Sequence, residues 1–444
     1  MRCASTSVVI TPPLGTSLAG YFTDRKAAGV LDDLYASVLI VEKDGAKVVL
    51  IACDLVDWPE EIASPLRATI AKRIGVDGCA VLLSATHTHT GPVTGGELAD
   101  RDYVQTLGDK IIAAAVEANG HLAPGALEYS AGVDTRFAFN RRYLMKNGSV
   151  MTNPGAHNPD VVGPAGVVDH SLQVVRVLDA GSQVAAVVVN CANHADTMDT
   201  TYISADWPGY LRARLQEAVG RDVPVLVLNG AAGDVNHFDV MNHRVVQSID
   251  EARRIGGGYG DTALEALERA QPLAMDAVAA VCGSAQVPYR HISDEELAQA
   301  HKTVAELKDD PEARLEGHLE SQDIARGHKA VRLMFAQGIV DAAREYRGKT
   351  KTLQVVVVGL GPLGLVGING EVFTDIGLAI KRNSVFEHTI VAELVNGSIG
   401  YLGTKKAYSQ GGYETMWGGR VCNEVEDYVL ETVSGLMKQV QEVR

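Results

Sequence analysis

The sequence predicts an α/β protein with a mixed β-sheet core, flanking helices and a helical subregion in its second half. Strand-like and helix-like segments alternate through the first half. Several strand-like segments are continuously apolar, as is typical of strands buried on both faces. From about residue 250 to 350 the chain turns to long, charged segments of helical period. No Pro/Ser/Gly-rich linker divides the 444 residues, so we expect one domain over 1–444 with a helical insertion or layer at 250–350.

Individual elements follow from spacing and turn residues. Asp44-Gly45 between residues 36–41 and 47–51 predicts a β-hairpin. Further strands are expected at 79–84, 172–178, 184–189, 223–228, 353–358, 363–368 and 389–394. Helices are expected at 59–74, 102–119, 207–219 (ending at Gly220), 261–273, 293–307, 325–346, 374–382 and from 422 onward. We interpret Gly256-Gly257-Gly258 as a flexible loop, because no Lys follows it.

Composition limits the classes of partner. The net charge of −15, with no basic stripe, argues against binding to nucleic acid or to anionic membranes. No apolar run reaches about 18 residues, so no transmembrane helix is expected. The first residues lack the apolar segment of a signal peptide, and we therefore expect a cytoplasmic protein.

The cysteines are scattered and form no C-x-x-C motif. We interpret them as buried thiols in a reducing compartment. They are Cys3, Cys53, Cys79, Cys191, Cys282 and Cys422.

The first candidate site follows the strand at 79–84, in a loop that contains His87 and His89. If the strand continues, side chains alternate and both imidazoles share one face. Such a pair suits a divalent transition metal, above all zinc. The alternative is two histidines that only form hydrogen bonds at a strand end.

Two further loops carry candidate ligands. His194 follows the strand at 184–189, and Glu371 lies between a strand and a helix. Two His and one Glu are a usual catalytic zinc set that leaves a position for water. Glu371 could instead be an acid that stabilises a helix N-terminus, and Cys191, Asp196 and Asp199 are alternative ligands or orienting groups.

Three familiar motifs are excluded. Residues 359–364 match G-x-G-x-x-G in spelling, but a strand rather than a helix is expected to follow, so they are interpreted as a turn. The sequence has no H-E-x-x-H and no G-x-S-x-G.

A set of ordered motifs extends along most of the chain. They are Ile10-Thr11-Pro12-Pro13-Leu14-Gly15, Leu18-Ala19-Gly20-Tyr21, Ala85-Thr86-His87-Thr88-His89-Thr90-Gly91-Pro92, His194, Asn229-Gly230-Ala231-Ala232-Gly233-Asp234, Gly370-Glu371, Gly400-Tyr401 and Gly412-Tyr413-Glu414. Together these motifs resemble the neutral/alkaline (non-lysosomal) ceramidase family, over residues 11–414.

The resemblance implies a zinc amidase that cleaves an N-acyl bond. It implies that zinc is held by His87, His194, Glu371 and Tyr401, with His89 in the second shell. It further implies that Tyr413 donates a hydrogen bond to the developing oxyanion and that Arg141 lies near the substrate.

The chain also departs from the family pattern. Asn236 stands where family ceramidases carry a Ser, which a zinc-hydroxide route does not need. The chain matches a short form without the C-terminal immunoglobulin-like domain. We therefore expect a small soluble amide substrate, no membrane partner and a possible homo-oligomer. The alternatives are a zinc-dependent esterase, lactonase, lactamase or lyase on this scaffold, or a non-catalytic metal-binding protein.

Overall fold

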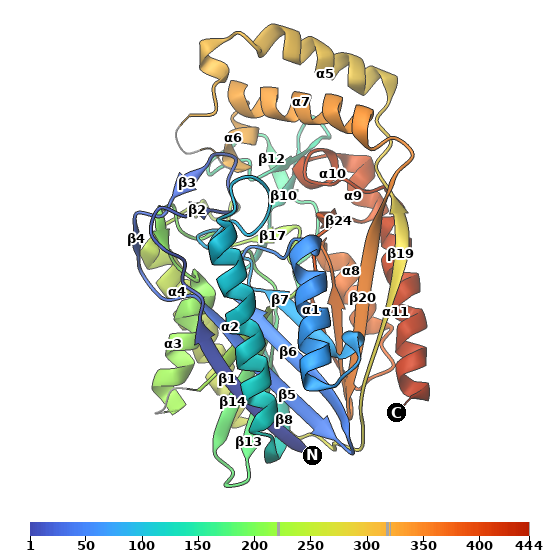
Figure 1. Ribbon diagram of the computed structural model, residues 1–444. Coiled ribbons are helices and arrows are strands. Elements are labelled where there is room, and N and C mark those ends of the chain that lie inside the picture. Colours follow the sequence, from blue (N-terminus) through green and yellow to red (C-terminus); the bar gives the residue numbers. More distant parts are fainter. Residues whose placement is uncertain (220–222, 317–318, 320, 444) are drawn as a thin grey trace.

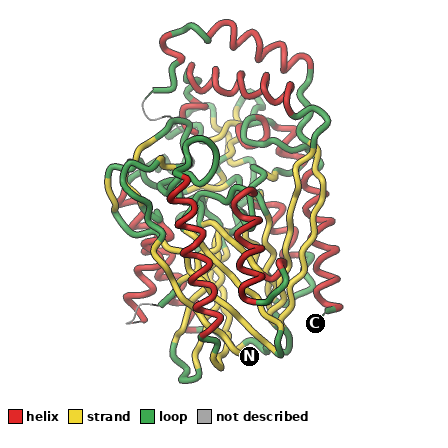
Figure 2. Tube along the Cα trace, in the orientation of Figure 1, coloured by secondary structure: helices red, strands yellow, loops and turns green. Residues whose placement is uncertain are grey.

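The computed structural model describes residues 1–219, 223–316, 319 and 321–443. Two β-sheets stack face to face, and helices cover both outer faces, which gives four layers (Figures 1 and 2). The predicted α/β class with flanking helices is confirmed. The stacking of two large sheets, rather than one, was not predicted.

The first sheet is mostly antiparallel, in the order β16-β14-β13-β8-β1-β5-β6-β7, and only β14–β16 and β6–β7 run parallel. Its strands are β1 (Arg2–Val9), β5 (Tyr35–Lys43), β6 (Ala46–Cys53), β7 (Val81–Ala85), β8 (Ala123–Val133), β13 (Ser171–Asp179), β14 (Val184–Cys191) and β16 (Val225–Asn229). The short β18 (Gln271–Pro272) adds to β8. The β5–β6 hairpin is confirmed, and both turn residues, Asp44 and Gly45, have the positive φ that such a tight turn requires.

The outer face of this sheet packs against α1 (Glu60–Ile74), α2 (Arg101–Gly120), α3 (Trp207–Val219) and α4 (Ile249–Glu268). Figure 1 shows α1 and α2 lying across the strands. The helices predicted at 59–74, 102–119 and 207–219 are thus confirmed, while the predicted stop at Gly220 lies outside the described residues. Among the described residues, no helix is long and apolar enough to cross a membrane.

The second sheet has the order β19-β20-β21-β23, antiparallel except for β21–β23. Its strands are β19 (Val278–Pro288), β20 (Thr350–Leu360), β21 (Leu363–Ile368) and β23 (His388–Ala392). Helices α8 (Thr374–Arg382) and α11 (Val425–Glu442) cover its outer face. The turn predicted at 359–364 is confirmed, since it joins β20 to β21.

Alternating side chains explain the continuously apolar strands. On β5, Val38 and Ile40 face the helices, whereas Leu39 and Val41 face the second sheet. Both directions are buried, so no polar alternation appears in the sequence.

The chain between residues 250 and 350 combines helices with one long strand. Helices α5 (Asp294–Leu307), α6 (Ser321–Ala325) and α7 (Lys329–Glu345) gather at the end of the molecule away from both termini (Figure 1). The strand β19 also belongs to residues 250–350, where only helices were expected. The division into one domain with an insertion stays a prediction.

Short elements complete the fold. They are β2 (Ser17–Leu18), β3 (Arg25–Lys26), β4 (Gly29–Val30), η1 (Gly78–Ala80), β9 (Phe139–Asn140), β10 (Arg142–Met145), β11 (Val150–Thr152), β12 (Val161–Pro164), β15 (Tyr202–Ile203), β17 (Val235–Asn236), η2 (Pro311–Ala313), β22 (Glu371–Val372), β24 (Tyr401–Leu402), α9 (Lys405–Gln410) and α10 (Tyr413–Met416).

The interpretation of Gly256-Gly257-Gly258 as a loop is wrong, because these residues lie inside α4. Helix α4 packs closely against α3, and a Cβ on Gly256 would lie 2.4 Å from the carbonyl oxygen of Trp207. Gly256 therefore permits the close approach of two helices, and Gly258 leaves room for the Phe137 ring.

The interpretation of all six cysteines as thiols is also wrong. Cys79 in η1 and Cys282 in β19 form a disulfide that ties an edge of the first sheet to the second sheet. Disulfides persist mainly in oxidising compartments, so this bond does not support the reducing compartment inferred from the sequence. The cytoplasmic location itself stays a prediction.

We predict that Cys79→Ser lowers the free energy of unfolding of protein isolated without reductant by about 2–5 kcal/mol. The bond closes a chain segment of 203 residues, so its loss frees much of the unfolded chain. Denaturant titration measures the effect, and Cys422→Ser, at a free thiol, is the matched control. Equal stability of Cys79→Ser and wild type would show that the bond does not form.

Candidate metal centre

The candidate site lies where the carboxyl ends of parallel strands from both sheets meet. His87 follows β7, His194 follows β14 and Glu371 follows β21. Polar side chains join the sheets at this edge. Asn396 Oδ1 accepts a hydrogen bond from Leu83 N at 2.9 Å, and Asn190 Nδ2 donates to the carbonyl oxygens of Leu228 and Val391. The topology thus brings three distant loops together.

The local geometry of His87 differs from the prediction. Strand β7 ends at Ala85, and His87 has a positive φ of 69°, so the expected alternation along a continuing strand is wrong. The two imidazoles still meet because the chain turns back. His89 N donates to the carbonyl oxygen of Ala195 at 2.9 Å, which fixes this loop beside the one that carries His194.

Backbone carbonyls determine which ring nitrogen of His87 and of His194 carries the proton. His87 Nδ1 lies 2.8 Å from the carbonyl oxygen of Val56, and His194 Nδ1 lies 3.1 Å from that of Ala232. Each Nδ1 must carry the proton to make these bonds, so each Nε2 keeps a lone pair. An Nδ1–H bonded to a carbonyl is the usual arrangement of a metal-binding histidine.

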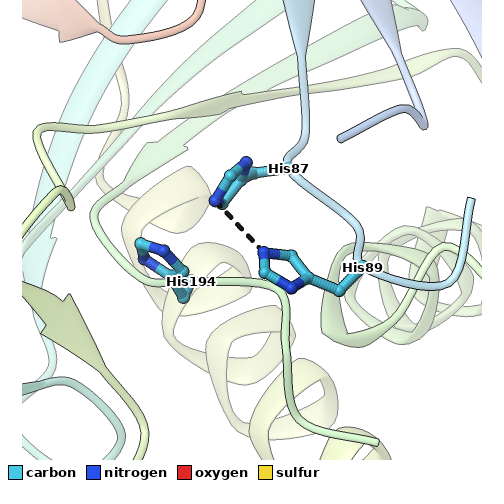
Figure 3. A group of neighbouring side chains, drawn as sticks. All are labelled: His87, His89 and His194. Atoms are coloured by element: carbon cyan, nitrogen blue, oxygen red, sulfur yellow. Dashed lines mark hydrogen bonds between the residues drawn. The ribbon is translucent and has the colours of Figure 1, made fainter. Parts of the chain in front are cut away.

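Three histidines form a compact group in Figure 3. The ligand atoms of His87, His89 and His194 all lie within 4.8 Å of one another, and His89 Nε2 is 3.3 Å from His87 Nε2. The geometry therefore offers His89 as a third nitrogen donor, as the H-x-H spacing allowed. Its second-shell role stays a prediction, and its Nδ1 lies 3.7 Å from Asp196 Oδ1.

Glu371 supplies a carboxylate oxygen to the same group. Its Oε2 lies 3.6 Å from His87 Nε2 and 3.4 Å from His194 Nε2. Among the described residues this buried oxygen has no hydrogen-bond partner. An unpartnered carboxylate oxygen that faces two imidazole lone pairs fits a divalent cation, which would satisfy all three atoms.

Tyr401 lies beside Glu371 because β22 and β24 pair in parallel, with these two residues in register. Its side chain interacts with Glu371 and with Arg141, whose guanidinium carbon lies 5.3 Å from the centroid of the Tyr401 ring. All four predicted ligands are thus in one place. Nothing in the spacing of the chain could have found Tyr401, because 30 residues separate its strand from that of Glu371.

Burial favours the neutral form of His89 and of His194. Burial, followed by the positive charge of Arg141, holds the pKa of His194 well below its usual range. Burial and then His87 lower the pKa of His89. Burial raises the pKa of Glu371, although His87, Arg141 and the hydrogen bond from Tyr401 oppose this effect. Neutral imidazoles are the form that binds metal.

Arg141 reaches into the centre from a buried charge network. Its Nη1 donates to His194 Nε2 at 2.9 Å, so a cation bound to that nitrogen would replace this hydrogen bond. Glu414 accepts from Arg141 Nε at 2.8 Å, from Arg142 Nη1 at 3.0 Å and from the Thr152 hydroxyl at 2.8 Å. Burial acts to lower the pKa of Arg141, but the acidic groups around it raise it overall.

Tyr413 lies at the start of α10 between the metal centre and a group of aromatic rings. Its ring centroid is 5.7 Å from that of Tyr401, and burial followed by Glu371 raises its pKa to about 12. Phe22 and Phe335 have their centroids 6.2 and 6.0 Å from that of Tyr413, and Trp417 stacks on Phe335. Helix α7 thus contributes an apolar ring next to the site.

The other candidate residues have different surroundings. Cys191 is buried in an apolar cluster, and Asp199 is exposed. Asp196 accepts a hydrogen bond from the Tyr21 hydroxyl at 2.6 Å. Asn236, in the place of the family Ser, donates through Nδ2 to Asn153 Oδ1 at 2.8 Å and accepts from Phe238 N. Its contacts are those of a residue that holds loops together.

The fold and the buried histidine–carboxylate group define an α/β protein with a candidate metal centre. In sequence the chain is similar to neutral ceramidase of Pseudomonas aeruginosa, with 27% identity over 285 residues. The match covers 56% of this chain and 41% of the relative, less than half of its length. No protein-family model matches the chain.

The fold is that of neutral ceramidase. The crystal structure of the P. aeruginosa enzyme superposes with a TM-score of 0.73 at 17% identity, and covers 99% of this chain and 75% of that one. A ceramidase complexed with C2 superposes with a TM-score of 0.74 at 16% identity, over 100% and 75% of the two chains. The predicted resemblance is confirmed.

We predict that Glu414→Gln lowers the free energy of unfolding by about 3–5 kcal/mol, because it leaves two buried guanidinium groups without a counter-charge. The pKa of Glu414 is lowered: burial opposes this shift, and the two arginines outweigh burial. The carboxylate therefore stabilises the fold above its unfolded pKa, and this contribution is lost as the pH falls through the lower folded pKa.

Urea titrations at pH 7 and at decreasing pH measure this difference, which should shrink in acid. The control is Asp250→Asn, at an exposed ion pair with Arg253, which should change stability by less than about 0.5 kcal/mol. A Glu414 variant as stable as the control would contradict the assigned role.

Proposed function

We propose that the protein is a zinc-dependent hydrolase that cleaves the amide (N-acyl) bond of a small soluble substrate with metal-activated water. The convergence of two imidazole lone pairs and an unpartnered carboxylate oxygen, from His87, His194 and Glu371, carries this proposal. The similarity to neutral ceramidase in sequence and fold supports the choice of an amide bond.

In this proposal His87, His194, Glu371 and Tyr401 hold the ion. The preference for zinc follows from the mixture of imidazole and carboxylate donors. A bound zinc ion would supply hydroxide at neutral pH by lowering the pKa of water to about 7.

The surrounding side chains provide the remaining chemistry. Water adds to the carbonyl carbon, the C–N bond breaks, and a carboxylic acid and an amine leave. Tyr413 and Arg141 donate hydrogen bonds to the oxyanion, and the raised pKa of Tyr413 keeps its hydroxyl protonated for this role. His89 takes the proton that the attacking water loses and returns it to the leaving nitrogen, since an amide nitrogen leaves poorly without one.

The aromatic group of Phe22, Phe335, Tyr413 and Trp417 favours an apolar acyl part in the substrate. In this proposal the apolar acyl group belongs to a small soluble N-acyl compound. A cytoplasmic location and assembly into a homo-oligomer stay predictions. An ester, lactone or lactam substrate, a lyase reaction and metal binding without catalysis are the competing functions.

We predict that the purified wild type contains about one zinc ion per chain, and that His87→Ala and Glu371→Ala both lose it, because each removes a donor from a buried site. Metal analysis after dialysis measures this. His157→Ala, at an exposed histidine that stacks on His243, is the control and should keep its zinc. A wild type without metal after zinc supplementation would rule out the proposed mechanism.

We predict that Tyr413→Phe keeps its zinc and lowers kcat by about 10²–10³, the usual effect of removing one oxyanion donor. His89→Ala should also keep its zinc while losing activity. Metal analysis and steady-state kinetics separate the two effects. Loss of zinc in His89→Ala would make His89 a ligand, as its distance from His87 permits.

We predict that wild type releases free amine from N-acyl compounds and that this activity disappears on chelation. A screen that pairs short-chain and long-chain N-acyl amides with the matching esters and lactones tests the bond class and the size of the acyl group. Faster turnover of the esters, with no amide cleavage, would favour the esterase alternative.

A further inference from the structure

Glu393 is a fully buried carboxylate behind the metal centre, and it has no role in the mechanism above. It follows directly after β23. Its Oε2 accepts hydrogen bonds from Val372 N at 2.9 Å and from Ala232 N at 3.2 Å. Its Oε1 accepts from Asn229 Nδ2 at 3.1 Å. One side chain thus joins two segments that are 140 residues apart in sequence.

Each of these segments fixes a predicted ligand. The carbonyl oxygen of Ala232 accepts from His194 Nδ1 and so determines which nitrogen of His194 faces the metal. Val372 directly follows Glu371 and lies with it in β22. The segments also touch each other, because Gly233 N donates to the carbonyl oxygen of Val372 at 2.9 Å. A Cβ on Gly233 would lie 2.5 Å from the carbonyl oxygen of Glu371.

We propose that Glu393, oriented by Asn229, is a positioning residue that sets His194 and Glu371 at the spacing a metal ion requires. The proposal rests on the proposed function. Residues that orient metal ligands without touching the ion commonly change metal affinity or activity by about 10–100-fold when replaced.

The hydrogen-bond pattern leaves little freedom. Both carboxylate oxygens of Glu393 accept, and all three of its partners donate. Asn229 cannot turn its amide over, because its Oδ1 already accepts from Asn193 N at 3.3 Å. Burial and then Glu371 raise the pKa of Glu393, while the two backbone hydrogen bonds oppose that shift.

This hydrogen-bond pattern predicts that an exchange of the amide and the carboxylate between positions 229 and 393 restores the contact. Glu393→Gln keeps one acceptor for the two backbone N–H groups but turns an NH₂ group toward the NH₂ of Asn229. Asn229→Asp alone places two carboxylates face to face. The double variant Glu393→Gln/Asn229→Asp restores a donor opposite an acceptor and conserves the net charge.

Zinc affinity, measured by competition with a chromogenic chelator, and the visible absorption spectrum of the cobalt-substituted protein provide readouts that do not depend on activity. We expect Glu393→Gln to bind zinc about 10–100-fold more weakly than wild type and to show an altered cobalt spectrum. The double variant should recover most of the affinity and the wild-type spectrum, which loss of stability alone would not produce.

Glu251→Gln is the control, because it neutralises another buried carboxylate, paired with Arg244 and Arg254, that contacts none of the predicted ligands. It should lower stability and leave zinc affinity unchanged. If Glu393→Gln does not fold, Asn229→Ala, which removes one hydrogen bond and keeps the carboxylate, should still weaken zinc binding several-fold.

Wild-type zinc affinity in either Glu393→Gln or Asn229→Ala, or a double variant no better than the single variants, would overturn this inference and leave the proposed function intact. A wild type that binds no zinc would overturn the proposed function and this inference together.

Discussion

Face-to-face packing of two sheets is the constraint on which the rest of the structure depends. It buries both faces of strands such as β7, β16, β21 and β23, so reactive side chains gather where these strands end. The parallel pairs β6–β7, β14–β16 and β21–β23 place several of those ends at one edge. Asn190 and Asn396 then join the sheets there, and the candidate metal centre occupies the seam between them.

Much of this architecture could be predicted because it depends on local patterns. Continuous apolar segments mark the buried strands, and Asp44-Gly45 marks a hairpin. The motifs around His87, His194 and Glu371 follow strand ends, where sites commonly form. What could not be predicted depends on contacts between distant segments. Gly256 was misassigned because it is α3, distant in sequence, that packs against it. The pairing of Cys79 with Cys282 becomes visible only once β19 lies beside η1.

The centre places imidazoles beside buried ion pairs. These ion pairs fix the geometry of the centre more than they stabilise the fold. Burial lowers the pKa of His89 and of His194, while Arg141 and Arg142 share one carboxylate, Glu414. Buried ion pairs of this kind contribute little net stability compared with apolar packing. The geometry of these ion pairs does hold Arg141 against His194. The positive charge of Arg141 therefore acts on any molecule bound at the centre. The hydrogen bonds of Glu414 and of Glu393 could not be predicted from the sequence, because the partners of both residues lie far away along the chain.

The order of the strands along the chain also has a consequence for biosynthesis. The main strands of the first sheet have all been made once residue 229 is complete, yet β19 to β23, which cover its inner face, end only at residue 392. A growing chain therefore presents a broad apolar surface, including Leu50 and Val188, throughout that interval. Such surfaces aggregate or recruit chaperones. Translation of the second sheet is thus the stage at which the chain that covers this apolar surface is made.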